Sequence, residues 1–224
     1  MKKILIIGVT SKIAEKFIES VKDVYEIYGT YQSKDFIKKD TVHYLPLDLN
    51  DHSSVEELTV LLHAHSFFSV FLFSSTYSKD ATSIDEYLLD AEKDLRINAL
   101  SPIAILKQLH YEPSATVFLF ADAGLQTPKK NFSAYSVSKH VLSALGTLLA
   151  VELANTARVV TFKLGPTMAP SNTDHAEEYY DRTLHRVDEP VQGLIRYIQF
   201  LMNEKNLSMT GTEIVYDGGT YLKR

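Results

Sequence analysis

Short apolar runs alternate with amphipathic stretches along the whole chain, and this alternation predicts its secondary structure. Runs such as Val70–Phe73 and Thr116–Phe120 are apolar on both faces of an extended strand, which is typical of strands in a sheet covered on both sides. We expect strands at Lys3–Ile7, Tyr25–Tyr31, Val42–Leu45, Ser69–Ser74, Ala115–Phe120, Arg158–Leu164 and Glu213–Tyr216. We expect helices at Ser11–Val21, Ser53–His65, Ile84–Leu109, Phe132–Ala154 and Pro190–Asn203.

Strand–helix alternation with this spacing favours right-handed crossovers and therefore the α/β class. We predict a doubly wound, Rossmann-type parallel sheet of about seven strands with helices on both faces. No linker, repeat or low-complexity tract interrupts the series, so residues 1–224 are expected to form a single domain. The least regular stretch, Pro166–Val187, is compatible with either a mobile lid or an ordinary surface loop.

Composition excludes several classes of function. The net charge of −5 provides no basic footprint for nucleic acid and no attraction to anionic membranes. No apolar run approaches the length of a membrane span, and the apolar run at the N-terminus is too short for a signal peptide. The chain has no Cys, which fits a reducing cytosol, and its eight His show no metal-ligand spacing. We therefore predict a soluble, cytoplasmic protein without a metal site.

The first strand is followed by a loop, Gly8–Ala14, that leads directly into a helix. A nucleotide pyrophosphate would sit here against free backbone N–H groups at the helix N-terminus. Gly8 permits the tight turn, and Ala14 is small enough for close helix–strand packing, but Lys12 occupies the position of the middle glycine. The side chain of Lys12 must point away from the phosphates or contact them itself. The residues of this loop expected to bind the cofactor are Gly8, Thr10, Ser11, Lys12 and Ile13.

The ends of the second and third expected strands suggest the type of cofactor. Asp48 and Leu49 follow the third strand, where a carboxylate can accept a hydrogen bond from an adenine amino group. At the end of the second strand, Gln32, Ser33 and Lys34 stand where an Asp or Glu would bind a ribose 2′-hydroxyl. Because no acid occupies that position and Ser33, Lys34 and Lys12 could meet a 2′-phosphate, the sequence favours NADP(H) over NAD(H).

Tyr135 and Lys139 lie four residues apart near the start of an expected helix, so their side chains share one helix face. A nearby ammonium favours the phenolate, and we expect it to lower the pKa of Tyr135 from about 10. Such a phenol is suited to donate or accept a proton during oxidation or reduction of a carbonyl. The spacing alone is weak, since about one such pair is expected by chance in a chain with 13 Tyr.

Several further motifs occur in a fixed order. The segment Thr210–Gly219 reads TGTEIVYDGG, Leu164–Thr167 reads LGPT after the sixth strand, and Ser74–Thr76 reads SST after the fourth. Together with the Gly8 loop and the YSVSK motif at Tyr135, they extend over the whole chain, which resembles the compact form of the short-chain dehydrogenase/reductase family. The loop is a degraded form of the family's TGxxxGxG turn, and SST replaces the usual NAG.

The resemblance implies a mechanism and further site residues. Hydride would pass between a nicotinamide and a carbonyl carbon, and Tyr135 would give or take the proton on oxygen. Lys139 would bind the nicotinamide ribose and lower the tyrosine pKa, and Asn98 would hold a water in a proton relay. The remaining residues that would contact the cofactor are Ser74, Ser75, Gly165 and Thr167.

The main departure from the family lies at Asp122, 13 residues before Tyr135, where the family has a serine or threonine that binds the substrate oxygen. Three interpretations remain open. Asp122 could be protonated in a dry pocket and donate a hydrogen bond as serine would. It could be ionised and bind a cationic or donor-rich substrate, leaving Tyr135 to act alone. The site could also have lost redox activity and retained only nucleotide binding.

We therefore predict an NADP(H)-preferring oxidoreductase acting on a small carbonyl or alcohol substrate, with Asn98, Asp122, Tyr135 and Lys139 as its catalytic residues. The alternative is a catalytically inactive nucleotide-binding sensor or scaffold of the same fold. The helix after Lys139 is apolar around more than one face, which predicts a homodimer or homotetramer. Candidate walls of the substrate pocket are Tyr77, Met168, Tyr179 and Tyr180.

Overall fold

The computed structural model describes residues 1–32, 36–126, 130–169, 179–204 and 208–222. Within these ranges the strands form one seven-stranded sheet in the order β3-β2-β1-β4-β5-β6-β7, and every neighbouring pair is parallel. The strands are β1 (Lys2–Ile7), β2 (Tyr25–Tyr31), β3 (Val42–Pro46), β4 (Ser66–Leu72), β5 (His110–Asp122), β6 (Ala157–Leu164) and β7 (Thr212–Tyr216). The Rossmann-type arrangement predicted from the sequence is thus confirmed.

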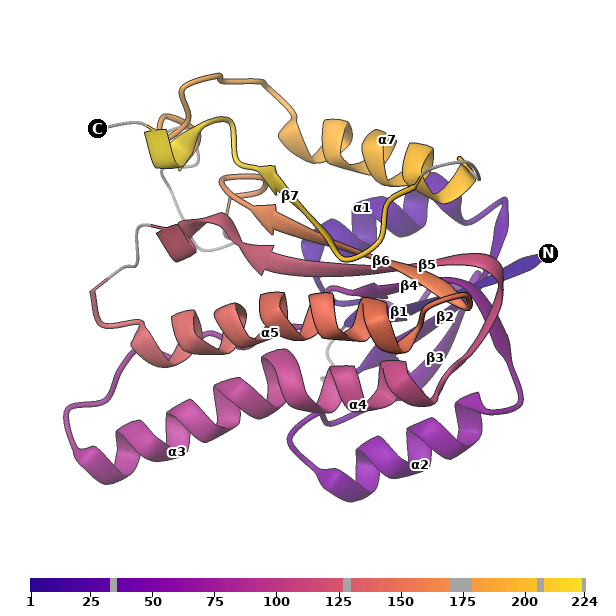
Figure 1. Cartoon of the computed structure of the whole chain (residues 1–224), viewed down its shortest axis with the longest axis horizontal. Coiled ribbons are helices and arrows are strands. Elements are labelled where there is room, and N and C mark those ends of the chain that lie inside the picture. Colours follow the sequence, from indigo (N-terminus) through magenta and orange to yellow (C-terminus); the bar gives the residue numbers. More distant parts are fainter. Residues whose placement is uncertain (33–35, 127–129, 170–178, 205–207, 223–224) are drawn as a thin grey trace.

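Helices cover both faces of the sheet (Figure 1). One face carries α1 (Lys12–Val21) and α7 (Pro190–Asn203). The helices on the other face are α2 (His52–Leu62), α3 (Ile84–Leu95), α4 (Ser101–Gln108) and α5 (Ser133–Glu152). The order of strands reverses between β1 and β4, so the carboxyl ends of these two strands form the switch point at which open α/β sheets bind ligands.

The single long helix expected at Ile84–Leu109 is interrupted by a π-helical turn, Arg96–Leu100. There the N–H of Ser101 donates to the carbonyl of Arg96, five residues back, instead of four. The interruption has a local cause, because Pro102 lacks an N–H and its ring would clash with the carbonyl four residues earlier in a regular helix. Turns of this kind often occur at functional sites, and this one contains Asn98.

A ladder of stacked Phe side chains forms the core between the sheet and the layer of α1 and α7. Phe71 stacks on Phe118 with ring centroids 5.0 Å apart, and Phe73 stacks on Phe120 at 4.3 Å. Phe162 of β6 extends the ladder at 5.9 Å from Phe120. Such pairs stabilise the fold beyond simple burial of area. The ladder also places Phe73 and Phe120 at the carboxyl edge of the sheet, beneath the site.

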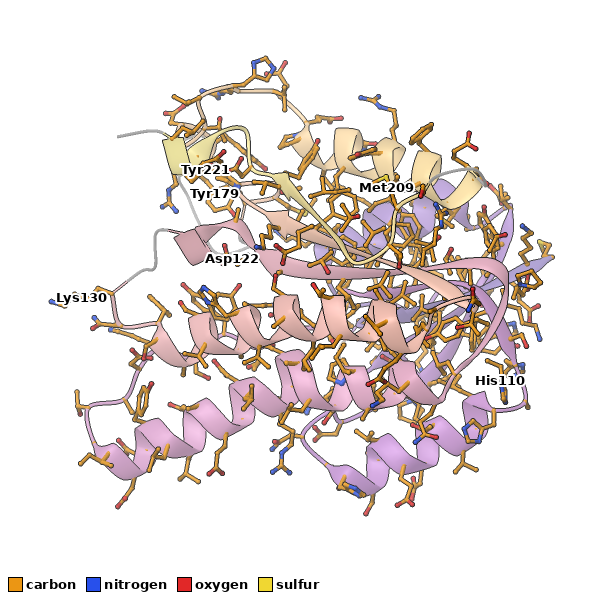
Figure 2. The ribbon with its side chains drawn as sticks, in the orientation of Figure 1. His110, Asp122, Lys130, Tyr179, Met209 and Tyr221 are labelled. Carbon is orange, nitrogen blue, oxygen red and sulfur yellow. The ribbon has the colours of Figure 1, made fainter. Side chains whose placement is uncertain are left out.

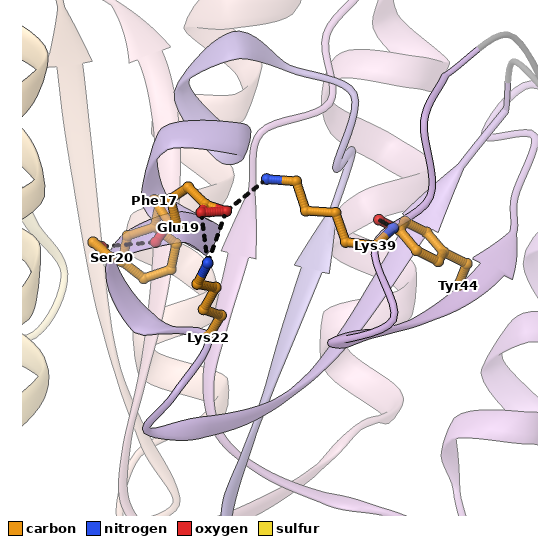
Figure 3. A network of polar contacts seen from close by, with 6 residues as sticks. All are labelled: Phe17, Glu19, Ser20, Lys22, Lys39 and Tyr44. Carbon is orange, nitrogen blue, oxygen red and sulfur yellow. Dashed lines mark hydrogen bonds and ion pairs between the residues drawn. The ribbon is translucent and has the colours of Figure 1, made fainter.

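An exposed polar network connects the C-terminal end of α1 to the segment that precedes β3 (Figure 3). Glu19 pairs with Lys22 and with Lys39, each at 3.0 Å, and the backbone N–H of Lys39 donates to the hydroxyl of Tyr44. Exposed ion pairs contribute little stability, so we expect this network to add little to the free energy of folding.

Element boundaries agree with the sequence prediction to within a few residues, with one useful difference. β5 begins at His110 and continues to Asp122, whereas the sequence predicted Ala115–Phe120. Asp122 is therefore the last residue of a central strand, and its backbone position is fixed by pairing with Leu164 of β6. Among the described helices, none combines the length and hydrophobicity that crossing a lipid bilayer requires.

Candidate active site

A crevice crosses the carboxyl edge of the sheet at the β1/β4 switch point. It consists of a cavity of about 480 Å³ on the β2 side and a second of about 320 Å³ on the β5 side. Both cavities are lined by Ser11, Phe73 and Ser75, so they are two halves of one elongated site. We call the larger the nucleotide half and the smaller the catalytic half.

Gly8 allows the ends of β1 and β4 to approach closely in the nucleotide half. Its φ is +94°, and a Cβ at this position would lie only 2.6 Å from the backbone nitrogen of Ser74. No other residue is tolerated without moving the main chain. The N–H of Gly8 donates to the hydroxyl of Thr30, 3.1 Å away, which fixes the turn to β2.

The N-terminus of α1 opens into the same space. Ser11 is the residue before the helix, and its side chain makes no capping hydrogen bond, so the first-turn N–H groups are available to a ligand. The hydroxyl of Ser74 is buried and has no hydrogen-bond partner among the described residues. Free donors at a helix N-terminus and an unsatisfied hydroxyl beside a glycine turn fit a nucleotide pyrophosphate.

Eight of the residues predicted to bind the cofactor line the nucleotide half. Those that line it are Gly8, Thr10, Ser11, Gln32, Asp48, Leu49, Ser74 and Ser75. One Asp48 oxygen accepts from the N–H of Asn50 at 2.8 Å, which orients the carboxylate at the end of β3. The sequence analysis missed Lys93 and Ile97 of the α3 region, which also line this half.

The three residues predicted to meet a 2′-phosphate are not placed in the nucleotide half. Lys12 is exposed, and its Nζ lies 3.4 Å from the carbonyl of Ala169, toward the segment after β6. Ser33 and Lys34 lie outside the described residues, so the structure does not bear on their proposed contact with a 2′-phosphate. A cation that the sequence analysis overlooked lies near the end of β2. Lys38 Nζ lies 4.7 Å from the centroid of the Tyr31 ring.

Tyr135 and Lys139 come from the first two turns of α5 and both line the catalytic half. Lys139 is only 4% exposed, and its Nζ donates to the carbonyl of Phe120 at 3.1 Å. Burial lowers the pKa of Lys139 to about 8, although the negative charges of Asp122 and Asp94 oppose this shift. The amine therefore changes its charge close to neutral pH.

The Tyr135 hydroxyl donates to a carboxylate oxygen of Asp122 at 3.0 Å, and the other oxygen of Asp122 accepts from the N–H of Gly124 at 2.6 Å. Burial and then the charge of Asp122 raise the pKa of Tyr135 well above its ordinary value. The expectation that Lys139 lowers this pKa is therefore wrong, because the lysine turns to Phe120 and a carboxylate lies against the phenol instead. The phenol of Tyr135 is thus hydrogen-bonded to the side chain of Asp122, and its pKa is raised.

Two more tyrosines complete the surroundings of Asp122. The Tyr77 ring contacts the Tyr135 ring edge-on, with centroids 4.7 Å apart, and stacks on Phe132. Tyr179 lines the catalytic half, and Figure 2 shows it at the same end of the sheet as Asp122. Burial, followed by the charge of Asp122, raises the pKa of both Tyr77 and Tyr179. Asp122 is therefore close enough to three phenols to influence each of them.

Asn98 is held in place by hydrogen bonds of its side-chain amide. It is fully buried, and its amide oxygen accepts from the N–H of Thr76 at 2.7 Å. Its amide nitrogen donates to the Thr76 carbonyl at 3.0 Å and to the Ser138 hydroxyl at 2.9 Å. Ser138 in turn donates to the carbonyl of Tyr135. Asn98 thus connects the π-turn, the segment after β4 and the helix that carries the tyrosine.

The segment after β6 forms the remaining wall. Gly165 lines the catalytic half and approaches Asp217 so closely that a Cβ would lie 2.5 Å from the Asp217 Cβ. Thr167 is buried and lines a separate third cavity of about 310 Å³, and its hydroxyl donates to the Gly165 carbonyl. Ile13, which was predicted to bind the cofactor, also lines the catalytic half.

The four candidate pocket walls separate into different environments. Tyr179 lines the catalytic half and Tyr77 lies against Tyr135, whereas Tyr180 lines the third cavity. Met168 packs against the core of α1 and α7. The residues that line the catalytic half without having been predicted from the sequence include Arg182, Asp217, Thr220 and Tyr221. Asp217 belongs to the recognised terminal motif, but Arg182 lies in an irregular stretch without any periodic signal.

The fold and the crevice define a Rossmann-type α/β protein with its site at the switch point. The family model described as enoyl-(acyl carrier protein) reductase matches residues 8–221, nearly the whole chain. The protein therefore belongs to the short-chain dehydrogenase/reductase family of oxidoreductases. No curated protein matches the sequence significantly.

Solved structures agree in fold. A 4-hydroxyisoleucine dehydrogenase complexed with NADH has a TM-score of 0.84 at 16% identity, with 100% of both chains covered. A short chain dehydrogenase family protein from Francisella tularensis subsp. tularensis SCHU S4 has a TM-score of 0.81 at 20% identity, with 99% of both chains covered. A short chain dehydrogenase from Burkholderia cenocepacia J2315 in complex with NADP has a TM-score of 0.81 at 16% identity, with 98% of both chains covered.

The described residues contain no group of three or more His, Cys, Asp or Glu side chains placed to hold a metal ion. The ionisable side chains that line the catalytic half include the carboxylate of Asp122, the phenol of Tyr135 and the amine of Lys139. This donor set is suited to proton transfer beside an organic cofactor.

Proposed function

We propose that this protein is a nicotinamide-dependent oxidoreductase that interconverts a carbonyl and an alcohol, with Tyr135 as the proton donor and acceptor. The observation that carries this proposal is the position of Tyr135 and Lys139 in a cavity continuous with the helix N-terminus and the Gly8 turn. One half can hold a dinucleotide while the other presents an acid to its reactive end.

The residues of the catalytic half would have different roles in this reaction. The bound nicotinamide supplies or accepts the hydride. Tyr135 holds a proton across the neutral range, because its pKa is raised, and can deliver it to the oxygen of a substrate carbonyl. Lys139, close to its own pKa at neutral pH, would bind the nicotinamide ribose from the floor of the cavity. Phe73 and Phe120 exclude water beneath both groups.

NADP(H) is favoured over NAD(H). The end of β2 presents Gln32 to the nucleotide half rather than an acid that would bind a 2′-hydroxyl. Lys38 supplies a positive charge beside Tyr31 at the same strand end, and Ser33 and Lys34 remain the sequence-based candidates for a 2′-phosphate. Solved structures of similar fold are complexed with NADH and with NADP, so the fold accommodates either cofactor.

A homodimer or homotetramer in the cytoplasm is part of this proposal. Three apolar side chains of α5, namely Val137, Leu148 and Val151, are exposed on the surface. Apolar side chains along one helix are better suited to packing against a second copy than to contact with water. Light scattering of the purified protein tests this point, and a monomer would contradict it.

The alternative function, a catalytically inactive nucleotide-binding sensor or scaffold, is favoured by one observation. Asp122 accepts a hydrogen bond from the Tyr135 hydroxyl, so the phenolic proton points away from a substrate. An ionised carboxylate beside a developing alkoxide also opposes carbonyl reduction. The two functions differ in turnover but not in cofactor binding.

Nicotinamide fluorescence distinguishes these accounts, because the chain has no Trp to contribute background. We expect enhanced NADPH emission on binding and NADPH oxidation with a panel of carbonyl compounds. Binding without turnover, and no effect of Tyr135→Phe, would favour the sensor. No binding of NADPH or NADH would contradict both functions.

A further inference from the structure

Asp122 is a carboxylate in the catalytic half whose charge is not neutralised by an ion pair within the described parts of the chain. Its two hydrogen-bond donors, the Gly124 N–H and the Tyr135 hydroxyl, are both neutral. Each carboxylate oxygen can accept more than one hydrogen bond, so both oxygens of Asp122 retain capacity for a further donor from the cavity. A partly buried charge with only neutral partners favours a cationic ligand.

The aromatic surroundings favour the same kind of ligand. Tyr77 and Tyr135 meet edge-on at 4.7 Å, and Tyr179 lies near the same carboxylate. Aromatic faces attract cations, and a carboxylate combined with several aromatic rings is a common way to bind an ammonium group. Tyr135 and Tyr179, which line the catalytic half, would also reduce contact of the charge pair with water, whereas Tyr77 is exposed.

Two cationic side chains, Lys139 and Arg182, line the catalytic half, and neither forms an ion pair with Asp122 in the described part of the chain. Lys139 turns its amine to the carbonyl of Phe120. The Arg182 guanidinium lies 5.5 Å from the centroid of the Tyr179 ring. The other carboxylate of the cavity lining, Asp217, accepts hydrogen bonds from the backbone N–H groups of Gly219 and Tyr221. Asp122 is therefore the carboxylate placed beside the reacting phenol.

The distance between the two polar atoms sets the spacing of the substrate groups. The Tyr135 hydroxyl and the nearer Asp122 oxygen are 3.0 Å apart. In a ketone with an amine on the next carbon, standard bond lengths put nitrogen and oxygen roughly 3 Å apart when they point the same way. One such molecule can therefore place its ammonium on Asp122 and its carbonyl oxygen on Tyr135.

We propose that the substrates are α-aminoketones and the corresponding amino alcohols, with the ammonium group bound by Asp122; this rests on the hydride-transfer function proposed above. The carbonyl carbon accepts hydride from the reduced nicotinamide, which becomes oxidised. The C=O bond pair moves to oxygen, which takes the phenolic proton of Tyr135, and water returns a proton to the phenolate. The ammonium offsets the charge of Asp122 and frees the phenol to face the carbonyl.

Pairs of ketones that differ only in replacement of an ammonium by a methyl group test this inference. The pairs are aminoacetone with butanone, and α-aminoacetophenone with propiophenone. We expect kcat/KM of NADPH oxidation to favour the ammonium member by about tenfold or more, the effect of one charge-assisted hydrogen bond. Asp122→Asn keeps the acceptor for Gly124 and removes the charge, and it should reduce the preference to near unity.

The matched control is Glu152→Gln, which removes a carboxylate paired with Lys107 at the far end of α5 and should leave the preference unchanged. Equal rates for both members of each pair in the native protein would overturn the inference while leaving the proposed function intact. Asp122→Ser, which restores a hydroxyl, should raise the rate with the neutral ketones relative to the charged ones.

A binding measurement separates failure of this inference from failure of the proposed function. Phenylethanolamine is an amino alcohol and cannot be reduced by NADPH. Calorimetry of its binding to the NADPH complex therefore reports recognition alone. Binding that Asp122→Asn abolishes, in the absence of any ketone turnover, would support recognition of the ammonium group by Asp122 and contradict the proposed oxidoreductase activity. Neutral ethyl phenyl carbinol binding as tightly as the amine would overturn the inference.

Discussion

The nucleotide half and the catalytic half of the crevice are built from different parts of the chain. The nucleotide half is largely main chain, formed by the Gly8 turn and the N-terminus of α1. The catalytic half is formed by the side chains of Asp122, Tyr135 and Lys139, which come from β5 and α5. The two halves join at Ser11, Phe73 and Ser75.

This difference explains which changes of sequence each half tolerates. A main-chain site accepts a lysine at the middle glycine position, because the Lys12 side chain reaches away to Ala169. In a side-chain site, one carboxylate in place of a hydroxyl changes the electrostatics of the whole cavity. The nucleotide half should therefore control cofactor affinity, and the catalytic half should control turnover and choice of substrate.

The largest expected effect separates the two halves directly. Tyr135→Phe should lower kcat by about 100- to 10,000-fold, because it removes the general acid, and leave the Kd for NADPH within a few-fold. Stopped assays of NADPH oxidation and fluorescence titration measure the two quantities. Tyr111→Phe is the control, since this buried phenol donates only to the Leu106 carbonyl, away from the crevice, and kcat should not change.

Gly8→Ala should have the opposite pattern. The new Cβ meets the backbone of Ser74 in a left-handed conformation, so NADPH affinity should fall by about tenfold or more and the free energy of unfolding by about 1–3 kcal/mol. Gly211→Ala is the control for the positive φ, because its Cβ would lie 3.4 Å from Ala150, in ordinary contact, and should leave the Kd for NADPH unchanged. An unchanged Kd for NADPH in Gly8→Ala would contradict the role assigned to the nucleotide half.

The charge of Lys139 predicts that activity and stability change in opposite directions as pH rises. Its amine loses its proton as pH rises through about 8, so kcat/KM should fall about tenfold for each pH unit above that value. Stability should change in the other direction. Because the pKa of Lys139 in the folded protein lies below its ordinary 10.5, the unfolded chain binds more protons between these values and Lys139 makes folding more favourable as pH rises. Lys139→Met should remove both trends, measured by pH–rate profiles and denaturant titration.

The smallest effect concerns the choice of cofactor. Lys38→Ala should weaken NADPH binding by about two- to fivefold, the size of an exposed charge contact, and leave NADH binding unchanged. Lys22→Ala removes a cation of the α1 network drawn in Figure 3, away from the crevice, and should change neither. Loss of NADH and NADPH binding alike in Lys38→Ala would contradict the proposed 2′-phosphate contact.

The sheet and much of the nucleotide half could be predicted from the sequence because their signals are local. An apolar run predicts a buried strand, and a glycine followed by a helix predicts a turn that can bind phosphate. The pair Tyr135 and Lys139 could be found for the same reason, since four residues along a helix fix their relative position.

The remaining features depend on contacts between distant parts of the chain. The raised pKa of Tyr135 required knowing that Lys139 turns to the Phe120 carbonyl, 19 residues earlier. Arg182 reaches the catalytic half from an irregular stretch without periodicity. The π-turn at Arg96–Leu100 depends on hydrogen bonding around Pro102, which a helical pattern of apolar residues does not reveal.

That wider turn has a consequence for insertions and deletions. A π-turn accommodates one extra residue, so the helix on either side keeps the phase that it would have without that residue. Removing one residue from Arg96–Leu100 would therefore restore regular winding and leave the fully buried side chains of Ile105 and Leu106 facing the core, but Asn98 would lose its alignment with Thr76. Such a deletion should therefore disturb the crevice more than the packing of α4.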